Sequence, residues 1–281
     1  MKPLTTRRNF LKHTALLSAL PFLVNAKEPQ TEKLKFIHIT DSHMDLGNEE
    51  SIDAMHLMVD FLNTHHKDLD FVLFGGDNFN NNAKGNEDAL AFKKIVEKLH
   101  CPSYYVRGNK ESNPHPDDGI HAEAFKTIFL SSPSLHVEGK DWILEKKGYI
   151  LLGLDSCIEG ANHGRYTEET IRFAQNALKK GKPTIILNHH PYTNYWKSSD
   201  PKEIHKYVLN NTQEVQKRLF HFDNLLLTLS GHKHIDSVTK INQTQVIVTR
   251  GFIRPLDMDR YPMRLVEING STLHEKLIYT T

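Results

Sequence analysis

The fold is indicated most clearly by residues 34–43, which read LKFIHITDSH. The first seven residues form a largely apolar run typical of a buried strand, and Asp41 and His43 follow it directly. Comparable blocks follow four further apolar runs: Gly76-Asp77, Gly108-Asn109, Asn188-His189-His190 and Gly231-His232-Lys233-His234. Each block therefore places polar side chains that bind metals where a strand is expected to end.

The apolar runs alternate with stretches of helical spacing. Strands are expected at 34–40, 71–74, 104–106, 149–154 and 184–187, and helices at 52–62, 90–99, 168–178 and 203–219. The last third changes to closely spaced strands, expected at 225–229, 235–240, 245–249, 264–268 and 272–279. This order predicts an α/β fold with a β-rich final part. We interpret residues 27–281 as a single domain.

The five blocks are expected to meet, because ligands of open α/β sheets bind beyond the carboxyl ends of the strands. If the first strand stays extended, Asp41 and His43 share one face. Gly76 and Gly108 allow tight turns that present Asp77 and Asn109 inward. Carboxylates, a carboxamide and several imidazoles suit two close metal ions bridged by one carboxylate. We therefore predict a dinuclear metal site, whose chemistry is chiefly the hydrolysis of phosphate esters.

These blocks resemble those of the calcineurin-like metallophosphoesterases, and the match extends over residues 34–250. The resemblance implies a four-layer α/β/β/α sandwich and two metal ions drawn from iron, manganese and zinc. It implies a first metal held by Asp41, His43, Asp77 and His234. It implies a second metal held by Asp77, Asn109, His189 and His232, with Asp77 as the bridge.

A second set of residues is similar to bacterial cyclic-nucleotide phosphodiesterases of this family: Leu154-Asp155-Ser156, Gly160, His163-Gly164-Arg165 and the stretch from Pro183 to Pro191. The resemblance implies a phosphodiesterase that uses a hydroxide held between the two metals. It implies catalytic roles for Asn109, Lys110 and His189, and contacts to the substrate from His163, Arg165 and His190. For His163 and Arg165, a hydrogen-bonded turn before a helix is an equally good interpretation.

Lys110 stands where many members of the family have a histidine that protonates the leaving group. Lysine carries a positive charge and donates hydrogen bonds, so we expect Lys110 to replace the histidine in part. The alternative is that it only screens charge at the rim of the site. Two other functions stay open: an exported phosphomonoesterase or nucleotidase of broad specificity, and a catalytically weak protein that binds metals or ligands.

Residues 1–26 resemble a twin-arginine signal peptide. Thr6-Arg7-Arg8-Asn9-Phe10-Leu11-Lys12 precedes an apolar run at 14–24, and the small-residue pattern of a cleavage site, Val24-Asn25-Ala26, follows. The run is shorter than the roughly 20 residues that cross a membrane, so we expect no stable membrane anchor after cleavage. A tethering helix is the alternative. We expect the twin-arginine machinery to export the protein to the periplasm or the medium.

The mature chain is expected to be mildly acidic. Cleavage removes four bases and no acid, which leaves 31 bases against 34 acids. That balance lacks the basic footprint of a nucleic-acid-binding protein, so the expected partner is a small phosphorylated substrate. Cys101 and Cys157 adjoin strand-like runs and are expected to be buried free thiols. The polar segments 111–118 and 192–201 are expected to be exposed loops at the rim of the site.

Overall fold

The computed structural model describes residues 31–80, 82, 84–112, 122–193, 208–253 and 260–280. The predicted signal peptide, residues 1–26, lies outside the described residues, as do 113–118 and 194–201 of the two predicted rim loops. Among the helices of the described ranges, none is long and apolar enough to cross a membrane.

Two β-sheets form the centre of the molecule. The five-stranded sheet has the order β12-β11-β1-β2-β3, with β1 at Leu34–Ile39, β2 at Phe71–Phe74, β3 at Ser103–Tyr105, β11 at Pro262–Asn269 and β12 at Thr272–Tyr279. The seven-stranded sheet has the order β4-β5-β6-β7-β8-β10-β9, with β4 at His136–Glu138, β5 at Asp141–Lys146, β6 at Tyr149–Gly153, β7 at Thr184–Leu187, β8 at Leu225–Ser230, β9 at Ser237–Ile241 and β10 at Thr244–Val248. Both sheets are therefore mixed. The parallel strands are β1, β2 and β3 at one end of the five-stranded sheet, and β6, β7, β8 and β10 within the seven-stranded sheet.

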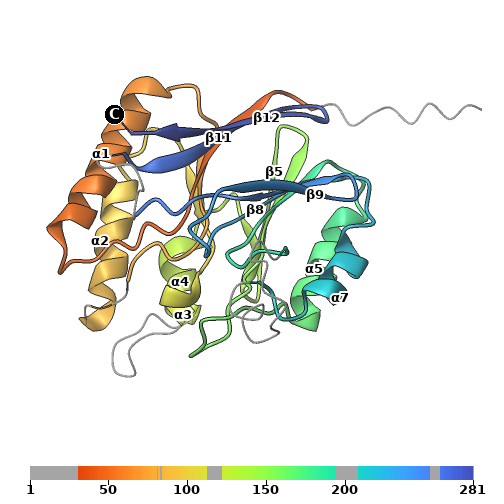
Figure 1. Ribbon diagram of the computed structural model, residues 1–281, viewed down its shortest axis with the longest axis horizontal. Helices are drawn as coiled ribbons and strands as arrows, with labels where there is room; N and C mark the ends of the chain where they lie inside the picture. Colours follow the sequence, from red (N-terminus) through yellow and green to blue (C-terminus); the bar gives the residue numbers. More distant parts are fainter. Residues whose placement is uncertain are drawn as a thin grey trace, which may run out of the picture.

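The helices lie outside the sheets. They are α1 Glu49–His65, α2 Glu87–Val96, α3 Asn109–Ser112, α4 Ala122–Phe129, α5 Glu168–Leu178 and α7 Thr212–Leu219, with a 3₁₀ turn at Lys84–Asn86. Figure 1 shows α1 and α2 on one side of the molecule and α5 and α7 on the opposite side. The helix α5 begins where Thr167 caps it, since its Oγ1 accepts the N–H of Thr170 at 3.2 Å.

The alternating side chains of β6 show how the layers pack. Tyr149 and Leu151 belong to a core that also contains buried residues of α1, α2 and the five-stranded sheet. Ile150 and Leu152 face the other way, into a second core with the buried residues of α5 and α7. The order of layers is therefore helices, sheet, sheet, helices, and the expected four-layer sandwich is confirmed.

The final third of the chain divides between the two sheets. Strands β8, β10 and β9 extend the seven-stranded sheet, whereas β11 returns to pair with β1 of the other sheet. The expected strands are present, with ends that differ by a few residues. The elements that were not expected are α3, α4, β4, β5 and the 3₁₀ turn. The expected helix at 203–219 appears as α7 from residue 212, and residues 203–207 lie outside the described ranges.

Candidate metal centre

Asp41 and His43 follow β1, but the chain does not stay extended there. Both residues have left-handed backbone angles, with φ of 57° and 44°. The prediction that they share one face of an extended strand is therefore wrong. The chain turns because it stays bonded to the loop after β2: Asp41 N donates to Gly76 O, and His43 N to Asp77 O, each at 2.9 Å. The two side chains still converge, with 3.9 Å between His43 Nε2 and Asp41 Oδ1.

Asp77 and Asn109 lie on two loops that touch. Asp77 follows β2 with φ of 49°, after Gly76 with φ of 93°. A Cβ atom added to Gly108 would lie only 2.2 Å from Asp77 N, so this glycine is required by the close approach of the loops. Asn109 begins α3, and the next residue, Lys110, donates its backbone N–H to Asp77 Oδ1 at 2.7 Å.

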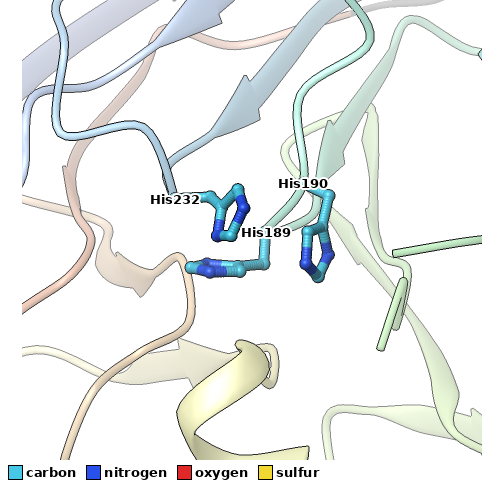
Figure 2. Close-up of side chains that lie close together, drawn as sticks. All are labelled: His189, His190 and His232. Carbon is cyan, nitrogen blue, oxygen red and sulfur yellow. The ribbon is translucent and has the colours of Figure 1, made fainter. Parts of the chain in front are cut away.

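The histidines come from the seven-stranded sheet. His189 and His190 follow β7, and His232 and His234 lie between β8 and β9 with φ of 70° and 54°. Figure 2 shows the imidazoles of His189, His190 and His232 gathered beyond these strand ends, with ring centroids 4.5–5.0 Å apart. The carboxylate of Asp41 accepts the N–H of His232 at 2.9 and 3.1 Å, which ties the two sheets together.

Three groups of side chains present ligand atoms within 4.8 Å of one another: Asp41, His43 and His234; Asp41, Asp77 and His189; and His189, His190 and His232. Asn109 joins the last group, since its Oδ1 lies 2.8 Å from His232 Nδ1 and 3.1 Å from His189 Nε2. Asp77 lies between the groups, with Oδ2 3.8 Å from His43 Nε2 and Oδ1 3.5 Å from His189 Nε2. The structure therefore brings all seven predicted ligands together.

In two imidazoles Nδ1 donates a hydrogen bond, which leaves Nε2 to hold a proton or a metal ion. His43 Nδ1 lies 3.0 Å from Asn80 Oδ1, so Nδ1 is the donor and Nε2 an acceptor. That Nε2 faces His234 Nε2 at 3.1 Å and the carboxylate of Asp77. His189 Nδ1 likewise donates to a backbone carbonyl at 2.9 Å, and its Nε2 faces Asp77. Converging acceptors need a positive charge between them, and this donor set fits divalent cations with ligands at about 2.0–2.2 Å.

Electrostatics at the centre favour cations. Burial favours the neutral forms of Asp41 and Asp77, yet the imidazoles of His234 and His189 hold the pKa values of these carboxyls below their usual range. Burial also opposes the charged form of His189, but the charge and hydrogen bond of Asp77, with smaller contributions from Asp41 and the carbonyl of Gly75, together outweigh it and raise the pKa of His189 to about 9. A positive charge is thus stabilised at His189 Nε2, and a metal ion there would replace the proton.

Glu111 is a buried carboxylate that the sequence analysis missed. The prediction that 111–118 is an exposed loop is wrong for its first two residues, because Glu111 and Ser112 are buried in α3. Glu111 accepts backbone N–H groups from Gly108 at 2.7 Å and Asn78 at 2.6 Å. Burial, followed by the charge of Asp77, raises its pKa to about 7. Its position shortly after the Gly108-Asn109 block was the available signal, since a helical turn folds it back under that loop.

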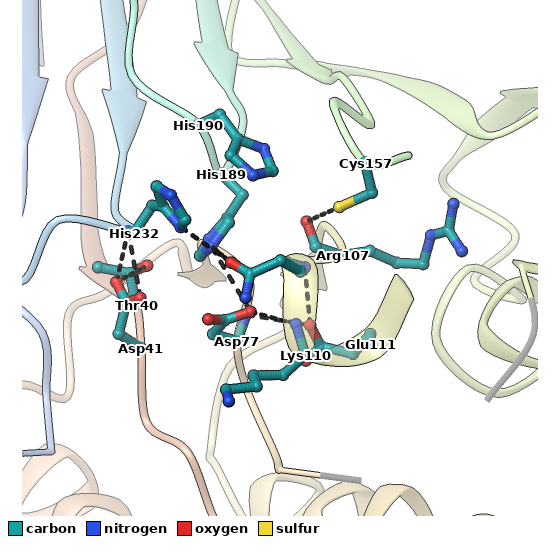
Figure 3. Close-up of polar contacts among 12 residues, drawn as sticks. Thr40, Asp41, Asp77, Arg107, Lys110, Glu111, Cys157, His189, His190 and His232 are labelled. Atoms are coloured by element: carbon teal, nitrogen blue, oxygen red, sulfur yellow. Dashed lines mark hydrogen bonds and ion pairs between the residues drawn. The ribbon is translucent and has the colours of Figure 1, made fainter. Parts of the chain in front are cut away.

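The loop after β6 supports the centre from behind. Arg107 Nε donates to Asp155 Oδ2 at 2.6 Å, and both side chains are buried. Cys157 Sγ donates to Arg107 O at 3.4 Å, while Ser156 Oγ lies 2.8 Å from His190 Nδ1. Figure 3 shows Cys157 and Arg107 beside the helix turn that carries Lys110 and Glu111. Both cysteines are free and buried as predicted, and burial raises the pKa of Cys157 well above its usual value.

The residues predicted to face the substrate lie in different surroundings. Lys110 is exposed, and Figure 3 shows its side chain running past Asp77 on the side away from His190. The imidazole of His190 is buried. His163 is half-buried and Arg165 exposed, in the turn before α5. Over the part of the chain that is described, neither side chain bonds to the seven predicted ligands, so their contact with a substrate stays a prediction.

Residues 34–236 match the family model of the calcineurin-like phosphoesterases, which covers most of the chain. The chain belongs to this family. The matched residues contain all five blocks, from Asp41 and His43 to Gly231-His232-Lys233-His234. The family assignment and the clustered carboxylates and imidazoles together indicate a pair of metal ions, whose identity they do not specify.

Two bacterial relatives of this phosphoesterase carry phosphodiesterase names. A probable cyclic nucleotide phosphodiesterase of Coxiella burnetii is 23% identical over 211 residues, which cover 74% of this chain and 77% of that protein. A probable glycerophosphodiester phosphodiesterase of Arcobacter nitrofigilis is 27% identical over 193 residues, 63% of this chain. The latter alignment spans 61% of the relative, less than two thirds of its length.

Solved structures agree with the architecture. A dimetal phosphatase from Danio rerio superposes with a TM-score of 0.66 at 14% identity, covering 88% of this chain and 99% of that one. A purple acid phosphatase from yellow lupin, Lupinus luteus, gives a TM-score of 0.63 at 12% identity, covering 90% of this chain and 52% of that one. These likenesses confirm the fold of this phosphoesterase.

Proposed function

We propose that this phosphoesterase hydrolyses phosphodiesters and depends on two metal ions. The observation that carries the proposal is the position of Asp77. Its two carboxylate oxygens face different imidazoles, Oδ2 at 3.8 Å from His43 and Oδ1 at 3.5 Å from His189. A carboxylate between two groups of imidazoles suits a ligand that bridges two metals.

In this proposal one metal is held by Asp41, His43, Asp77 and His234, and the other by Asp77, Asn109, His189 and His232. Iron, manganese and zinc all accept such donors. When bound, the two ions supply the charge that activates a water at neutral pH and that neutralises the phosphoryl oxygens.

The contribution of the chain is to hold these side chains in one orientation. Thr40 Oγ1 donates to Asp41 Oδ2 at 2.8 Å, and Asn80 Oδ1 accepts from His43. Such outer contacts fix the tautomer and direction of each ligand. Lys110 is exposed beside Asp77, and we propose that its ammonium group donates a proton or hydrogen bond to the leaving oxygen.

The preference for diesters rests on sequence likeness. Both bacterial relatives are named as phosphodiesterases, and residues 154–165 resemble those of cyclic-nucleotide phosphodiesterases. The two solved phosphatase structures share the fold at 14% and 12% identity, so they favour neither diesters nor monoesters.

The test is hydrolysis of paired aryl substrates, bis(p-nitrophenyl) phosphate and p-nitrophenyl phosphate, by protein loaded with Mn²⁺, Zn²⁺ or Fe²⁺. Metal content per chain is measured on the same samples. We expect the diester to have the higher kcat/KM, the activity to vanish with a chelator, and Asp77→Asn to lose both metal and activity. A monoester preference would replace the proposal with a phosphomonoesterase. Two metals without turnover would indicate a binding protein.

We also propose that the twin-arginine machinery exports the protein to the periplasm or the medium. The support is the charged, apolar and cleavage regions of residues 1–26, in that order. This route carries folded proteins and so suits an enzyme that acquires its metals before export. Cell fractionation should find the native protein outside the cytoplasm, and the Arg7→Lys, Arg8→Lys double variant inside. Export of the double variant at native levels would contradict this route.

A further inference from the structure

Glu111 holds the backbone of two loops at once. Its Oε2 accepts the N–H groups of Gly108 at 2.7 Å and Asp77 at 3.0 Å. Its Oε1 accepts those of Asn78 at 2.6 Å and Phe79 at 3.4 Å. One buried carboxylate therefore serves four N–H groups, three from the loop that carries Asp77 and one from the loop that carries Asn109.

The two loops are also bonded in the opposite direction. The backbone N–H of Lys110, next to Glu111, donates to Asp77 Oδ1 at 2.7 Å, as Figure 3 shows. Each loop thus supplies a carboxylate that accepts backbone N–H groups of the other. Between them Gly108 leaves no room for a side chain, since a Cβ there would lie 2.3 Å from Asp77 Oδ1. The loops touch and are clamped from both sides.

We propose that Glu111 is a positioning residue, which fixes Asp77 relative to Asn109 and so sets the affinity of the site for the second metal. The proposal rests on the proposed function, in which these two side chains are ligands of that metal. Glu111 bonds the backbone of the loops and does not itself bind the ion.

The backbone of Asp77 shows why such a clamp is needed. With φ of 49° Asp77 holds a left-handed conformation, which a residue with a side chain keeps only when its surroundings impose it. Without Glu111, buried N–H groups on both loops would lose their acceptor and would have to reach water. The loops would separate, and Asp77 would relax away from Asn109.

The experiment compares metal binding by the native full chain with that of Glu111→Gln and Glu111→Asp. Glutamine keeps the shape but leaves one acceptor oxygen, and aspartate keeps the charge but is too short to serve both loops. Glu159→Gln is the matched control, because this nearby carboxylate is exposed and, among the described residues, bonds only the side chain of Arg107. Titration calorimetry with Mn²⁺ on metal-stripped protein gives the affinity and the number of sites. The spin coupling between two bound Mn²⁺ ions, measured by electron paramagnetic resonance, reports whether Asp77 bridges them. Urea unfolding of the same variants gives their stability.

We expect both Glu111 variants to bind the second Mn²⁺ about 10–100-fold more weakly, with altered spin coupling, while the control matches the native protein. A Glu111 variant that unfolds more easily but binds Mn²⁺ within twofold of native, with unchanged coupling, would reduce Glu111 to a structural role and overturn the proposal. If one variant does not fold, the other decides by the same criteria, and failure of both to fold while Glu159→Gln folds would also overturn it. Failure of the proposed function looks different, because the native chain itself would then bind no metal pair.

Discussion

Glu111 and Asp141 are both buried carboxyl groups whose pKa is raised to about 7, yet they hold different parts of the molecule. Glu111 accepts backbone N–H groups of the loops that carry Asp77 and Asn109. Asp141, at the start of β5, accepts the N–H of Asp155 at 2.8 Å, in the loop that supports the centre from behind. Glu111 therefore bonds the loops that carry the proposed ligands, whereas Asp141 bonds a loop that carries none of them.

The comparison suggests a rule: a buried carboxyl group affects metal binding when it bonds the backbone of a ligand loop. It affects only stability when it bonds the backbone of another loop. Burial penalises the charge of both carboxylates, so the difference comes from their partners. Substitutions in the loops that Glu111 bonds should move proposed ligands, and we expect them to lower metal affinity and activity. Substitutions near Asp141 that disturb packing or ion pairs should lower the free energy of unfolding. They should leave the metal site of the folded molecules intact.

The largest effect on activity is expected from a pair of glycine-to-alanine changes, one near Glu111 and one near Asp141. In Gly108→Ala the new Cβ would lie 2.2 Å from Asp77 N, and in Gly153→Ala it would lie 1.9 Å from the Trp142 ring. Gly108→Ala must push the two ligand loops apart, and we expect kcat/KM to fall about 100-fold or more. Gly153→Ala crowds the core of the other sheet and should cost about 1–3 kcal/mol of unfolding free energy.

Kinetics on the folded fraction, with metal content and urea unfolding of the same samples, separate the two outcomes. The folded Gly153→Ala protein should keep kcat/KM within about twofold of native. Equal losses of activity per folded molecule in the two variants would remove the distinction between the sides.

The largest effect on stability is expected from Asp155→Ala, on the supporting side. Arg107 would lose its partner at 2.6 Å and, within the described ranges, would keep an ion pair with Glu159 alone, whose side chain is 55% exposed. Removing one member of a buried ion pair leaves an uncompensated charge, so we expect a loss of about 3–5 kcal/mol in unfolding free energy. Glu159→Ala is the control, with an expected loss below about 1 kcal/mol. Urea unfolding measures both, and similar small losses would mean that the buried pair is not important for stability.

Sequence patterns predicted the layers and the metal ligands of this molecule better than the buried carboxylates that hold the loops around the site. The strand at 71–74 and the helix at 168–178 have the predicted ends, because apolar runs and periodicity depend on neighbours in the chain. Glu111 and Asp141 were missed because a carboxylate among polar residues normally lies at the surface. Their partners are backbone N–H groups as many as 34 positions away, and no pattern of side chains records such a bond.

The left-handed angles at the centre were missed for a related reason. Aspartate and histidine adopt left-handed angles more often than most residues, but at Asp41 and His43 this preference is too weak to distinguish an extended strand end from left-handed backbone. Their conformation follows from hydrogen bonds to the neighbouring loop, which exist only once the sheet has formed. In β5, by contrast, the run Trp142-Ile143-Leu144 was a usable apolar signal for a strand, although charged residues at both ends obscured it.

A smaller effect, dependent on pH, is expected from Asp141→Asn. Burial is the main reason why the pKa of Asp141 rises from 3.8 to about 7; the charge of Asp155 adds to the rise, while the N–H of Asp155 and the charge of Lys140 oppose it. The folded protein therefore binds this proton more tightly than the unfolded chain does. The stability from this group is complete below about pH 4 and is lost as the pH rises through about 7.

Asparagine does not titrate and keeps an oxygen acceptor for the N–H of Asp155. Relative to the native protein, Asp141→Asn should therefore gain stability as the pH rises from 5 to 8, by about 1–3 kcal/mol at pH 8. Urea unfolding at several pH values measures the difference, with the exposed Glu138→Gln as the control. A difference that does not change with pH would show that Asp141 does not titrate in this range.

The smallest effect is expected from Lys110→Ala. This change separates the contribution of the Lys110 backbone from that of its side chain. Lys110 supplies its N–H to Asp77, and alanine supplies the same N–H, so metal affinity and stability should stay at native values. What is lost is the exposed ammonium group. If that group assists the leaving oxygen, kcat should fall about tenfold on a diester with an alkyl leaving group and less than twofold on an aryl diester, whose leaving group needs no proton. Lys110→His should restore part of the loss. An alanine variant that matches the native enzyme on both diesters would show that the Lys110 side chain contributes nothing to catalysis. This turn of helix would then act through Asn109, Glu111 and the backbone.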